Sequence, residues 1–170
     1  MTQQQPYKIL AQHKGFELRE YPAGVQIETT VGGDFINAGN LGFRPLVQFI
    51  SGNNNSRQSI AMTAPVIQES VGASKHMVRF VLPEEMKPGD VPASLDPRVK
   101  VLEVPKHLAA AKRFSGSWNQ EKFDLEGKKL ISELLSSGLE TTGSLYFARF
   151  DPPWKPGFLK RNEVLIRIKG

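Results

Sequence analysis

Few residues of this 170-residue chain have the type and spacing that enzymatic chemistry requires. The chain has no cysteine, so disulfides, thiolate metal sites and cysteine nucleophiles are excluded. It lacks the Gly-x-Ser-x-Gly elbow of the α/β-hydrolases and the GxGxxG phosphate loop. The histidines, His13, His76 and His107, show no metal-ligand spacing. We therefore expect no catalytic residue, no metal site and no enzyme.

Glu163 is the carboxylate that most needs an explanation. It begins a predicted terminal strand that continues through Val164 and Ile166. If it faced a cavity, its pKa would be raised and it could serve as a recognition or acid–base group. A glutamate at a strand end more commonly pairs with a nearby cation, here Arg161 or Arg167. The sequence favours the ion pair and keeps the acid–base role as the alternative.

The strongest indication of binding is apolar surface on a helix predicted over residues 35–51. The residues with helical spacing that form its main stripe are Ile36, Phe43, Val47 and Ile50. Further apolar residues outside this stripe are Leu41, Leu46 and Phe49. Pro45 leaves open a kink or a break into two short helices. A helix that is apolar on more than one face could cover a flat hydrophobic ligand.

The elements that must position these groups occur twice. Residues 16–22 (FELREYP) align with residues 99–105 (VKVLEVP) at an offset of 83 (99 − 16), without a gap as far as Gly33 over Gly116. Residues 61–65 align with residues 148–152 at an offset of 87 (148 − 61). Two strands, one helix and two strands recur in halves of about 16–83 and 99–169. A duplicated unit predicts a pseudo-twofold body with a cleft where the halves meet.

These elements predict an α+β fold. Short turns join the strands, so the sheet should be mainly antiparallel, and about eight strands could curl into a strongly twisted, barrel-like sheet. Two helices would flank it. The second is predicted after a capping box at Ser117, with Gly138 as its C-terminal cap. Its apolar stripe comprises Phe123, Leu130 and Leu134, widened by Ile131 and Leu135. We expect residues 1–170 to form a single domain.

The net charge and the lengths of the apolar runs limit the classes of binding partner. The formal net charge is +5, with a sequence pI near 9.5, but no nucleic-acid-binding module appears. A modest positive field suits an anionic small ligand, although a solvated basic surface is the commoner cause. No apolar run approaches the roughly 20 residues of a membrane span, and the N-terminus lacks the pattern of a secretory signal. We expect a soluble, cytoplasmic monomer without a nucleic-acid partner.

Several segments match the motifs of one known family, in the family's order and across nearly the whole chain. They are FELREYP at 16–22, FISGN at 49–53, IAMTAPV at 60–66, VRFVLP at 78–83, FSG at 114–116, FDPP at 150–153 and RNEVL at 161–165. On these motifs the chain resembles the SOUL haem-binding proteins, and MTAPV and RNEV are the most specific of them. It is also similar to the effector-binding domains of some bacterial regulators.

The resemblance implies reversible, non-covalent binding of haem or a related tetrapyrrole as a carrier or buffer, without catalysis. In one branch an arginine and two methionines of the first helix contact the porphyrin, and these positions fall on Asn40, Phe43 and Val47. Arg44 lies four residues after Asn40, so it could hold an anionic propionate from the same face. In another branch an axial histidine is proposed, and Glu20 occupies that position here, which is a poor ligand for haem iron.

Three functions follow for the same chain. The first is a carrier of a small hydrophobic ligand with anionic groups, namely haem or another tetrapyrrole. The second is a general small-molecule or effector-binding protein with no haem role. The third, which the sequence favours least, is an enzyme that uses Glu163 in the cleft between the halves.

Overall fold

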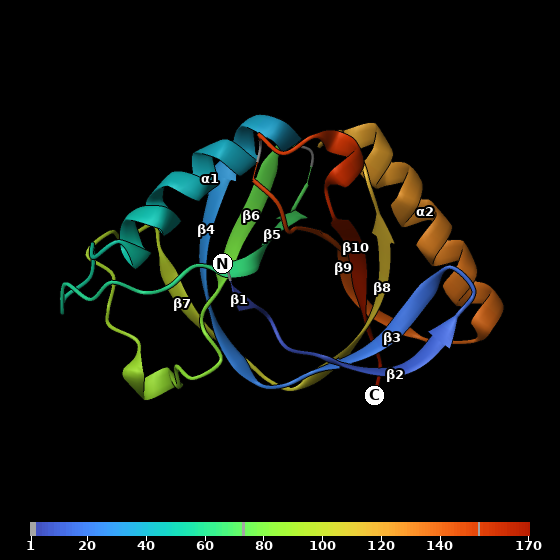
Figure 1. Cartoon of the computed structure of the whole chain (residues 1–170), viewed down its shortest axis with the longest axis horizontal. Coiled ribbons are helices and arrows are strands. Elements are labelled where there is room, and N and C mark those ends of the chain that lie inside the picture. Colours follow the sequence, from blue (N-terminus) through green and yellow to red (C-terminus); the bar gives the residue numbers. More distant parts are fainter. Residues whose placement is uncertain (1–2, 73, 153) are drawn as a thin grey trace. The chain divides into compact units, whose positions relative to one another are not determined.

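The computed structural model describes residues 3–72, 74–152 and 154–170. Pro153, the last residue of the FDPP motif, lies outside this part. The chain divides into two units: one is Ala23–Pro105 with the residues up to Gln5, and the other is Pro6–Pro22 with Lys106–Gly170. Each unit contains a mainly antiparallel sheet and one long helix (Figure 1). The predicted α+β class with two helices is therefore confirmed.

The sheet of the first unit has the strand order β5-β6-β4-β7. These strands are β4 (Gly24–Gly32), β5 (Thr63–Ser70), β6 (Lys75–Val81) and β7 (Lys100–Val104). Their mutual pairings are antiparallel, whereas the two-residue strand β1 (Gln3–Gln4) is parallel to β5. Helix α1 (Phe35–Ile50) packs on β4 and β6, and the short 3-10 helix η1 (Pro88–Asp90) lies between β6 and β7 in the chain.

The sheet of the second unit has the strand order β2-β3-β8-β10-β9, with all pairings antiparallel. The strands are β2 (Lys8–His13), β3 (Phe16–Tyr21), β8 (His107–Phe114), β9 (Thr141–Arg149) and β10 (Asn162–Ile168). Helix α2 (Gln120–Ser137) packs on β8 and β10. The short 3-10 helix η2 (Gly157–Leu159) lies between β9 and β10 in the chain.

The strand pairs β3–β8 and β7–β4 share one register. Tyr21 lies opposite His107 in the first pair, and Val104 lies opposite Gly24 in the second. The 83-residue offset converts one pair into the other, because 21 + 83 = 104 and 24 + 83 = 107. The first strand of each predicted half thus pairs with the second strand of the other half, and the two units divide the chain at different places from 16–83 and 99–169. The pseudo-twofold relation of the whole halves stays a prediction.

The second similarity, at an offset of 87, does not relate equivalent elements. Residues 61–65 lead into the start of β5, whereas residues 148–152 follow from the end of β9. The reason is the length of the connection after each helix. α1 ends at Ile50 and β5 begins at Thr63, but α2 ends at Ser137 and β9 begins at Thr141. No constant offset can span connections that differ this much.

Helix α1 runs from Phe35 to Ile50 as one helix with Pro45 inside it, so the alternative of two short helices is not realised. Its N-terminus is capped by Asp34, whose side chain accepts a 2.9 Å hydrogen bond from the backbone N–H of Asn37. The predicted stripe forms the packing face only in part, because Ile50 is buried and Val47 is half-buried whereas Ile36 and Phe43 are exposed. The buried residues of α1 are Phe35, Ala38, Gly39, Gly42, Pro45, Leu46, Phe49 and Ile50. Small residues on this face bring the backbone close to the sheet, and Ile36 and Phe43 are left 37% and 42% exposed.

Helix α2 follows its prediction more closely. Phe123, Leu130 and Leu134 are buried, and Gly138 ends the helix in the left-handed conformation with φ of 76°. The N-terminal cap is Asn119 rather than Ser117, because the Asn119 side chain accepts the backbone N–H of Lys122. The predicted widening residue Leu135 is 78% exposed, so it adds nothing to the packed face.

Each helix has glycine as its eighth residue, and both glycines face a strand. The helix starts and the glycines Gly42 and Gly127 share one offset, because 120 − 35 = 85 and 127 − 42 = 85. A Cβ at Gly42 would lie 2.5 Å from Cγ2 of Val78, and one at Gly127 would lie 2.9 Å from Cδ1 of Leu145. Both contacts are shorter than packed carbon atoms allow. The Leu145 methyl group can move aside, whereas the β-branched Val78 has little freedom, so the need for glycine is stronger at Gly42.

We predict that Gly42→Ala destabilises the protein. The added methyl group must displace Val78 or the helix, which costs about 1–3 kcal/mol, and the better helix propensity of alanine returns at most about 1 kcal/mol. Urea unfolding should show a net loss of about 1–2 kcal/mol. Gly24→Ala is the control, because a Cβ at Gly24 meets no atom within 4 Å. Unchanged or increased stability of Gly42→Ala would show that α1 does not need this close approach.

Candidate functional site

The four residues predicted to contact a ligand lie along one flank of α1, beside the face that packs on the sheet. Asn40, Phe43 and Arg44 are exposed, and Val47 is half-buried. Ile36 belongs to the same flank, since Ile36, Asn40, Phe43 and Val47 follow one another at helical spacing of three or four residues. We call Ile36, Asn40, Phe43, Arg44 and Val47 the α1 flank. An apolar strip with a guanidinium beside it is the arrangement that an amphipathic ligand requires.

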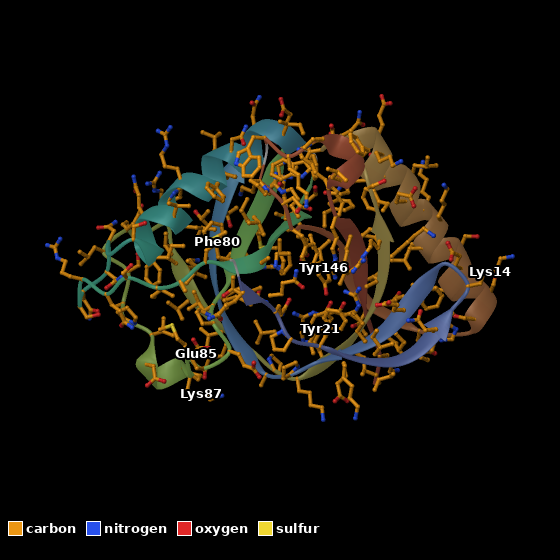
Figure 2. All side chains as sticks on the ribbon, in the orientation of Figure 1. Lys14, Tyr21, Phe80, Glu85, Lys87 and Tyr146 are labelled. Atoms are coloured by element: carbon orange, nitrogen blue, oxygen red, sulfur yellow. The ribbon has the colours of Figure 1, made fainter. Side chains whose placement is uncertain are left out.

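Phe43 is supported from beneath. Its ring meets the buried ring of Phe80 on β6 edge to face, with centroids 5.2 Å apart. Phe80 is labelled in Figure 2. Val47 packs against the core cluster that contains Phe80. One side of the Phe43 ring is therefore held in place while the other stays open, which reduces the conformational entropy that a bound ligand would have to remove.

The α1 flank offers contact to a macrocycle but no ligand to iron. It contains no histidine, methionine, cysteine or tyrosine. His76, the histidine of the first unit, is buried, with its ring nitrogens 3.1 Å from Oγ of Ser70 and from the carbonyl oxygen of Gly33. Within the described residues there is no group of three or more His, Asp or Glu side chains that could hold a metal ion. The residues present fit a flat apolar ring with an anionic edge.

The remaining histidines, and the position of the family's proposed axial ligand, lie in the second unit. His13 stacks on Phe16 with centroids 4.6 Å apart, and His107 stacks on Tyr21 at 5.3 Å. Glu20 pairs with Lys106 at 3.5 Å. None of these groups belongs to the α1 flank.

Glu163 lies in a buried ion cluster of the second unit. Its carboxylate accepts a bidentate pair of hydrogen bonds from Arg19, with Nη1–Oε1 at 2.7 Å and Nη2–Oε2 at 2.8 Å. Both side chains are at most 2% exposed. Arg161 is a second partner, and its Nη2 lies 2.9 Å from Oε2. The favoured prediction of an ion pair with Arg161 is therefore confirmed, and the Arg167 alternative is not realised in the described ion pairs.

Arg19 uses its remaining donors as well. Its Nε donates to Glu17 and its Nη1 donates to the hydroxyl of Tyr21, both at 2.9 Å. The guanidinium also lies 4.0 Å from the ring centroid of Tyr7. Burial alone would lower the pKa of Arg19, but the hydrogen bonds and electrostatic attraction of Glu163 and Tyr21 together outweigh it and raise the pKa above its usual value. Arg19 therefore stays charged and Glu163 stays fully coordinated.

This coordination argues against acid–base catalysis by Glu163. A general base needs a lone pair free to take a proton from a substrate, and both carboxylate oxygens already accept guanidinium donors. Sequence reasoning missed Arg19 as the main partner. The sequence did hold a hint, because the FELREYP motif contains the cation Arg19 and the RNEVL motif contains the anion Glu163. These two residues are 144 positions apart in the chain.

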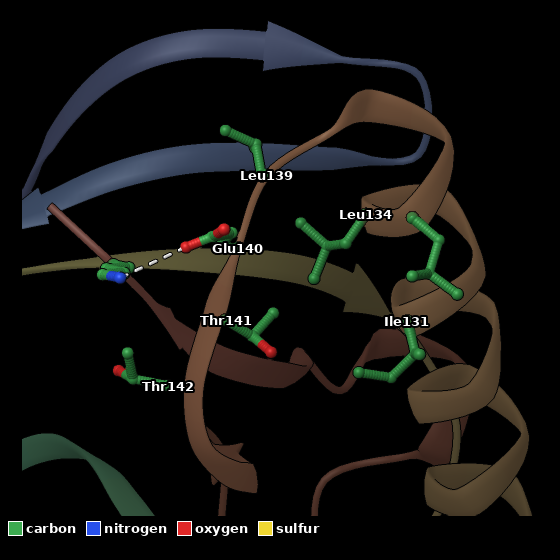
Figure 3. Close-up of a pocket in the computed structure, with 8 residues that line it drawn as sticks. Ile131, Leu134, Leu139, Glu140, Thr141 and Thr142 are labelled. Carbon is green, nitrogen blue, oxygen red and sulfur yellow. Dashed lines mark ion pairs between the residues drawn. The ribbon is translucent and has the colours of Figure 1, made fainter.

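A pocket of about 520 Å³ opens at the C-terminal end of α2, within the second unit (Figure 3). Its walls include Ile131 and Leu134 of α2 and the neighbouring Leu139. The exposed pair of Glu140 and Lys169, 3.5 Å apart, lies at its edge. Sequence analysis did not predict this pocket, because Leu139 and Glu140 fall in a connection of three residues between α2 and β9.

We predict that Glu163→Gln strongly destabilises the protein. Loss of the carboxylate charge removes the buried, bidentate counter-ion of Arg19 and leaves it only the partly exposed Glu17, which costs about 3–5 kcal/mol of unfolding free energy. The control is Glu140→Gln, which removes an exposed ion pair of at most about 1 kcal/mol. The double variant Arg19→Met/Glu163→Gln should lose less than the sum of the single losses when all are measured by urea unfolding. Additive losses, or a change in Glu163→Gln as small as in the control, would contradict the coupling.

Comparisons with known proteins agree with the motifs. The chain is 27% identical over 157 residues to "Heme-binding protein 1" of Xenopus laevis, covering 88% of this chain and 81% of that protein. Among solved structures, the C-terminal domain of EcmrR has a TM-score of 0.69 at 13% identity, covering 96% of this chain and 98% of that chain. A hydrolase from Listeria innocua has a TM-score of 0.61 at 11% identity, covering 94% of each chain. At these identities the two structures show a common fold alone.

None of the described helices is long and apolar enough to cross a membrane. The model of the SOUL heme-binding protein family matches residues 2–167, which is nearly the whole sequence. On that match, the chain belongs to the SOUL heme-binding protein family.

Proposed function

We propose that this protein binds haem or a related tetrapyrrole reversibly and without a covalent bond, and that it acts as a carrier or buffer. The observation that carries the proposal is the exposed ring of Phe43, 42% accessible and positioned by Phe80, with Ile36 and Val47 beside it and Arg44 at the border. Family membership and the name of the Xenopus relative support the same ligand class. In this role the protein would work as a cytoplasmic monomer.

The energetics of such a site rest on surface burial. Each Å² of apolar area removed from water contributes roughly 25 cal/mol, less the costs of association. Arg44 adds a charge-assisted hydrogen bond to a propionate, which also fixes the orientation of the ring. Haem, when bound, supplies iron whose chemistry depends on its axial ligands. The α1 flank contributes contact and charge, not iron coordination, and this suits a carrier that must release its ligand.

A second candidate function is the binding of a different small molecule in the pocket at the end of α2. The observation that favours it is the aliphatic wall of Ile131, Leu134 and Leu139 beside the ion pair of Glu140 and Lys169. Leu139→Trp would fill this pocket. It should abolish binding of a ligand held there, and it should leave porphyrin affinity unchanged if the porphyrin binds at the α1 flank.

We predict that Phe43→Ala weakens porphyrin binding by about 1–3 kcal/mol, because the ring loses its apolar contact with the macrocycle. The loss of folding stability should be smaller, at about 0.5–1.5 kcal/mol, because only the contact with Phe80 is removed. Leu41→Ala is the matched control, since Leu41 is 59% exposed on the opposite flank of α1. Porphyrin fluorescence titration and thermal unfolding measure the two quantities on each variant.

The opposite result would place Phe43 in the core. A cavity-forming substitution costs about 3–5 kcal/mol of unfolding free energy. If Phe43→Ala showed that loss with unchanged porphyrin affinity, or if Leu41→Ala weakened binding equally, the α1 flank would not be the site.

We further predict that iron-free protoporphyrin binds nearly as well as haemin. No side chain of the α1 flank coordinates iron, so the metal should add little affinity. The measurement is a Soret-band titration with haemin beside a fluorescence titration with protoporphyrin. A hundredfold preference for haemin, lost on replacing one of His13, His76 or His107, would reveal an axial ligand and contradict this account.

A further inference from the structure

The segment between β9 and β10 exposes more apolar surface than any folding role explains. Trp154 is 83% exposed, Phe158 is 78% exposed and Leu159 is 54% exposed. These three large side chains fall within six consecutive residues, from 154 to 159. We call residues 154–159 the aromatic loop. Exposed apolar residues clustered in this way mark an interaction surface, whereas single exposed apolar residues need no explanation.

The backbone of the aromatic loop is anchored although its side chains are displayed. The carbonyl oxygen of Gly157 accepts the backbone N–H of Gly116 at 2.9 Å, and Asp151 accepts the Lys155 ammonium at 2.7 Å. Lys160, directly after the loop, turns inward, with its Nζ 5.6 Å from the centroid of the Trp118 ring. The loop therefore holds Trp154 and Phe158 outward on a fixed base.

Charge favours one kind of partner. The cations of this segment are already engaged, because Lys155 pairs with Asp151, Arg161 pairs with Glu163 and Lys160 is buried. Attraction to a charged surface must therefore come from the protein as a whole. The whole chain carries a formal net charge of +5. Tryptophan is enriched at the boundary between lipid headgroups and acyl chains, and basic residues nearby add attraction to anionic headgroups. An outward tryptophan, phenylalanine and leucine on a protein of positive net charge match that chemistry.

We propose that the aromatic loop docks the protein on an anionic membrane surface. Trp154, Phe158 and Leu159 insert at the headgroup boundary, and the positive field of the protein draws it to the surface without any spanning segment. This surface is distinct from the α1 flank and does not depend on porphyrin binding. For a carrier of an amphipathic ligand, such docking would bring the protein to the membrane, where that ligand accumulates.

The test uses the full chain without porphyrin. Wild-type protein is sedimented with phosphatidylcholine vesicles, with and without phosphatidylglycerol. We expect binding to the anionic vesicles, weakened by added salt, and a loss of about tenfold or more in Trp154→Ala/Phe158→Ala because the inserted area is removed. Leu135→Ala is the matched control, as Leu135 is also 78% exposed but lies on α2. A circular dichroism spectrum of each variant checks whether the fold is retained.

Tryptophan emission gives an independent readout. Vesicle binding should shift the emission to the blue, and Trp154→Phe should remove that shift while most of the binding is kept. The proposal is overturned if the wild type does not sediment with anionic vesicles. That result is expected if the aromatic loop docks on a protein instead. The proposal is equally overturned if both vesicle types bind alike, or if Leu135→Ala loses as much binding as the double variant. Porphyrin affinity measured on the same variants should not change, which separates this proposal from the proposed function.

Discussion

Helix α1 lies so close to its sheet that one added methyl group at Gly42 would overlap Val78, and this close approach determines what the helix can offer a ligand. The face that permits it includes Ala38, Gly39 and Gly42, so much of the helix is packed through small side chains. The larger Ile36 and Phe43 then cannot also turn inward, and they remain on the flank. Tight packing and an exposed apolar strip are thus two consequences of one arrangement of residues.

In the second unit, the charged residues of the family motifs are buried against each other and are not exposed to a ligand. Arg19 and Glu163 are the kinds of side chain from which an active site could be built, yet each satisfies the other in a buried bidentate pair. Two strands on either side of β8 are joined by this interaction, since β3 carries Arg19 and β10 carries Glu163. The family motifs around these residues are therefore explained by structure, and the candidate binding surface, the α1 flank, does not include this ion cluster.

Much of the fold could be predicted because it depends on local patterns. The apolar stripe of Phe123, Leu130 and Leu134 predicted α2, and Gly138 predicted the end of that helix. The packing face of α1 could not be predicted in this way, because an apolar stripe indicates which residues avoid water but not how near the helix approaches the sheet. The choice of strand partner was equally inaccessible. The strand pairs β3–β8 and β7–β4 have the same register once residue numbers are shifted by 83. The sequence alone does not show that the first strand of each predicted half pairs with a strand of the other half.

The candidate site was predicted residue by residue through family resemblance, and only the structure shows its neighbours. Asn40, Phe43, Arg44 and Val47 were named from the sequence, whereas Ile36 joins them as an exposed neighbour. Arg19 was missed as the partner of Glu163 because 144 residues separate them. A long-range ion pair leaves no periodic signal in a sequence, so no local pattern could reveal it.

The most direct test of the central claim is methyl NMR of the protein titrated with protoporphyrin. A porphyrin ring current shifts the resonances of methyl groups that lie against its face. If the macrocycle binds at the α1 flank, the methyl signals of Ile36 and Val47 should move, while those of Ile131 and Leu139 in the pocket at the end of α2 stay in place. Shifts confined to Ile131 and Leu139, with Ile36 and Val47 unaffected, would contradict the account.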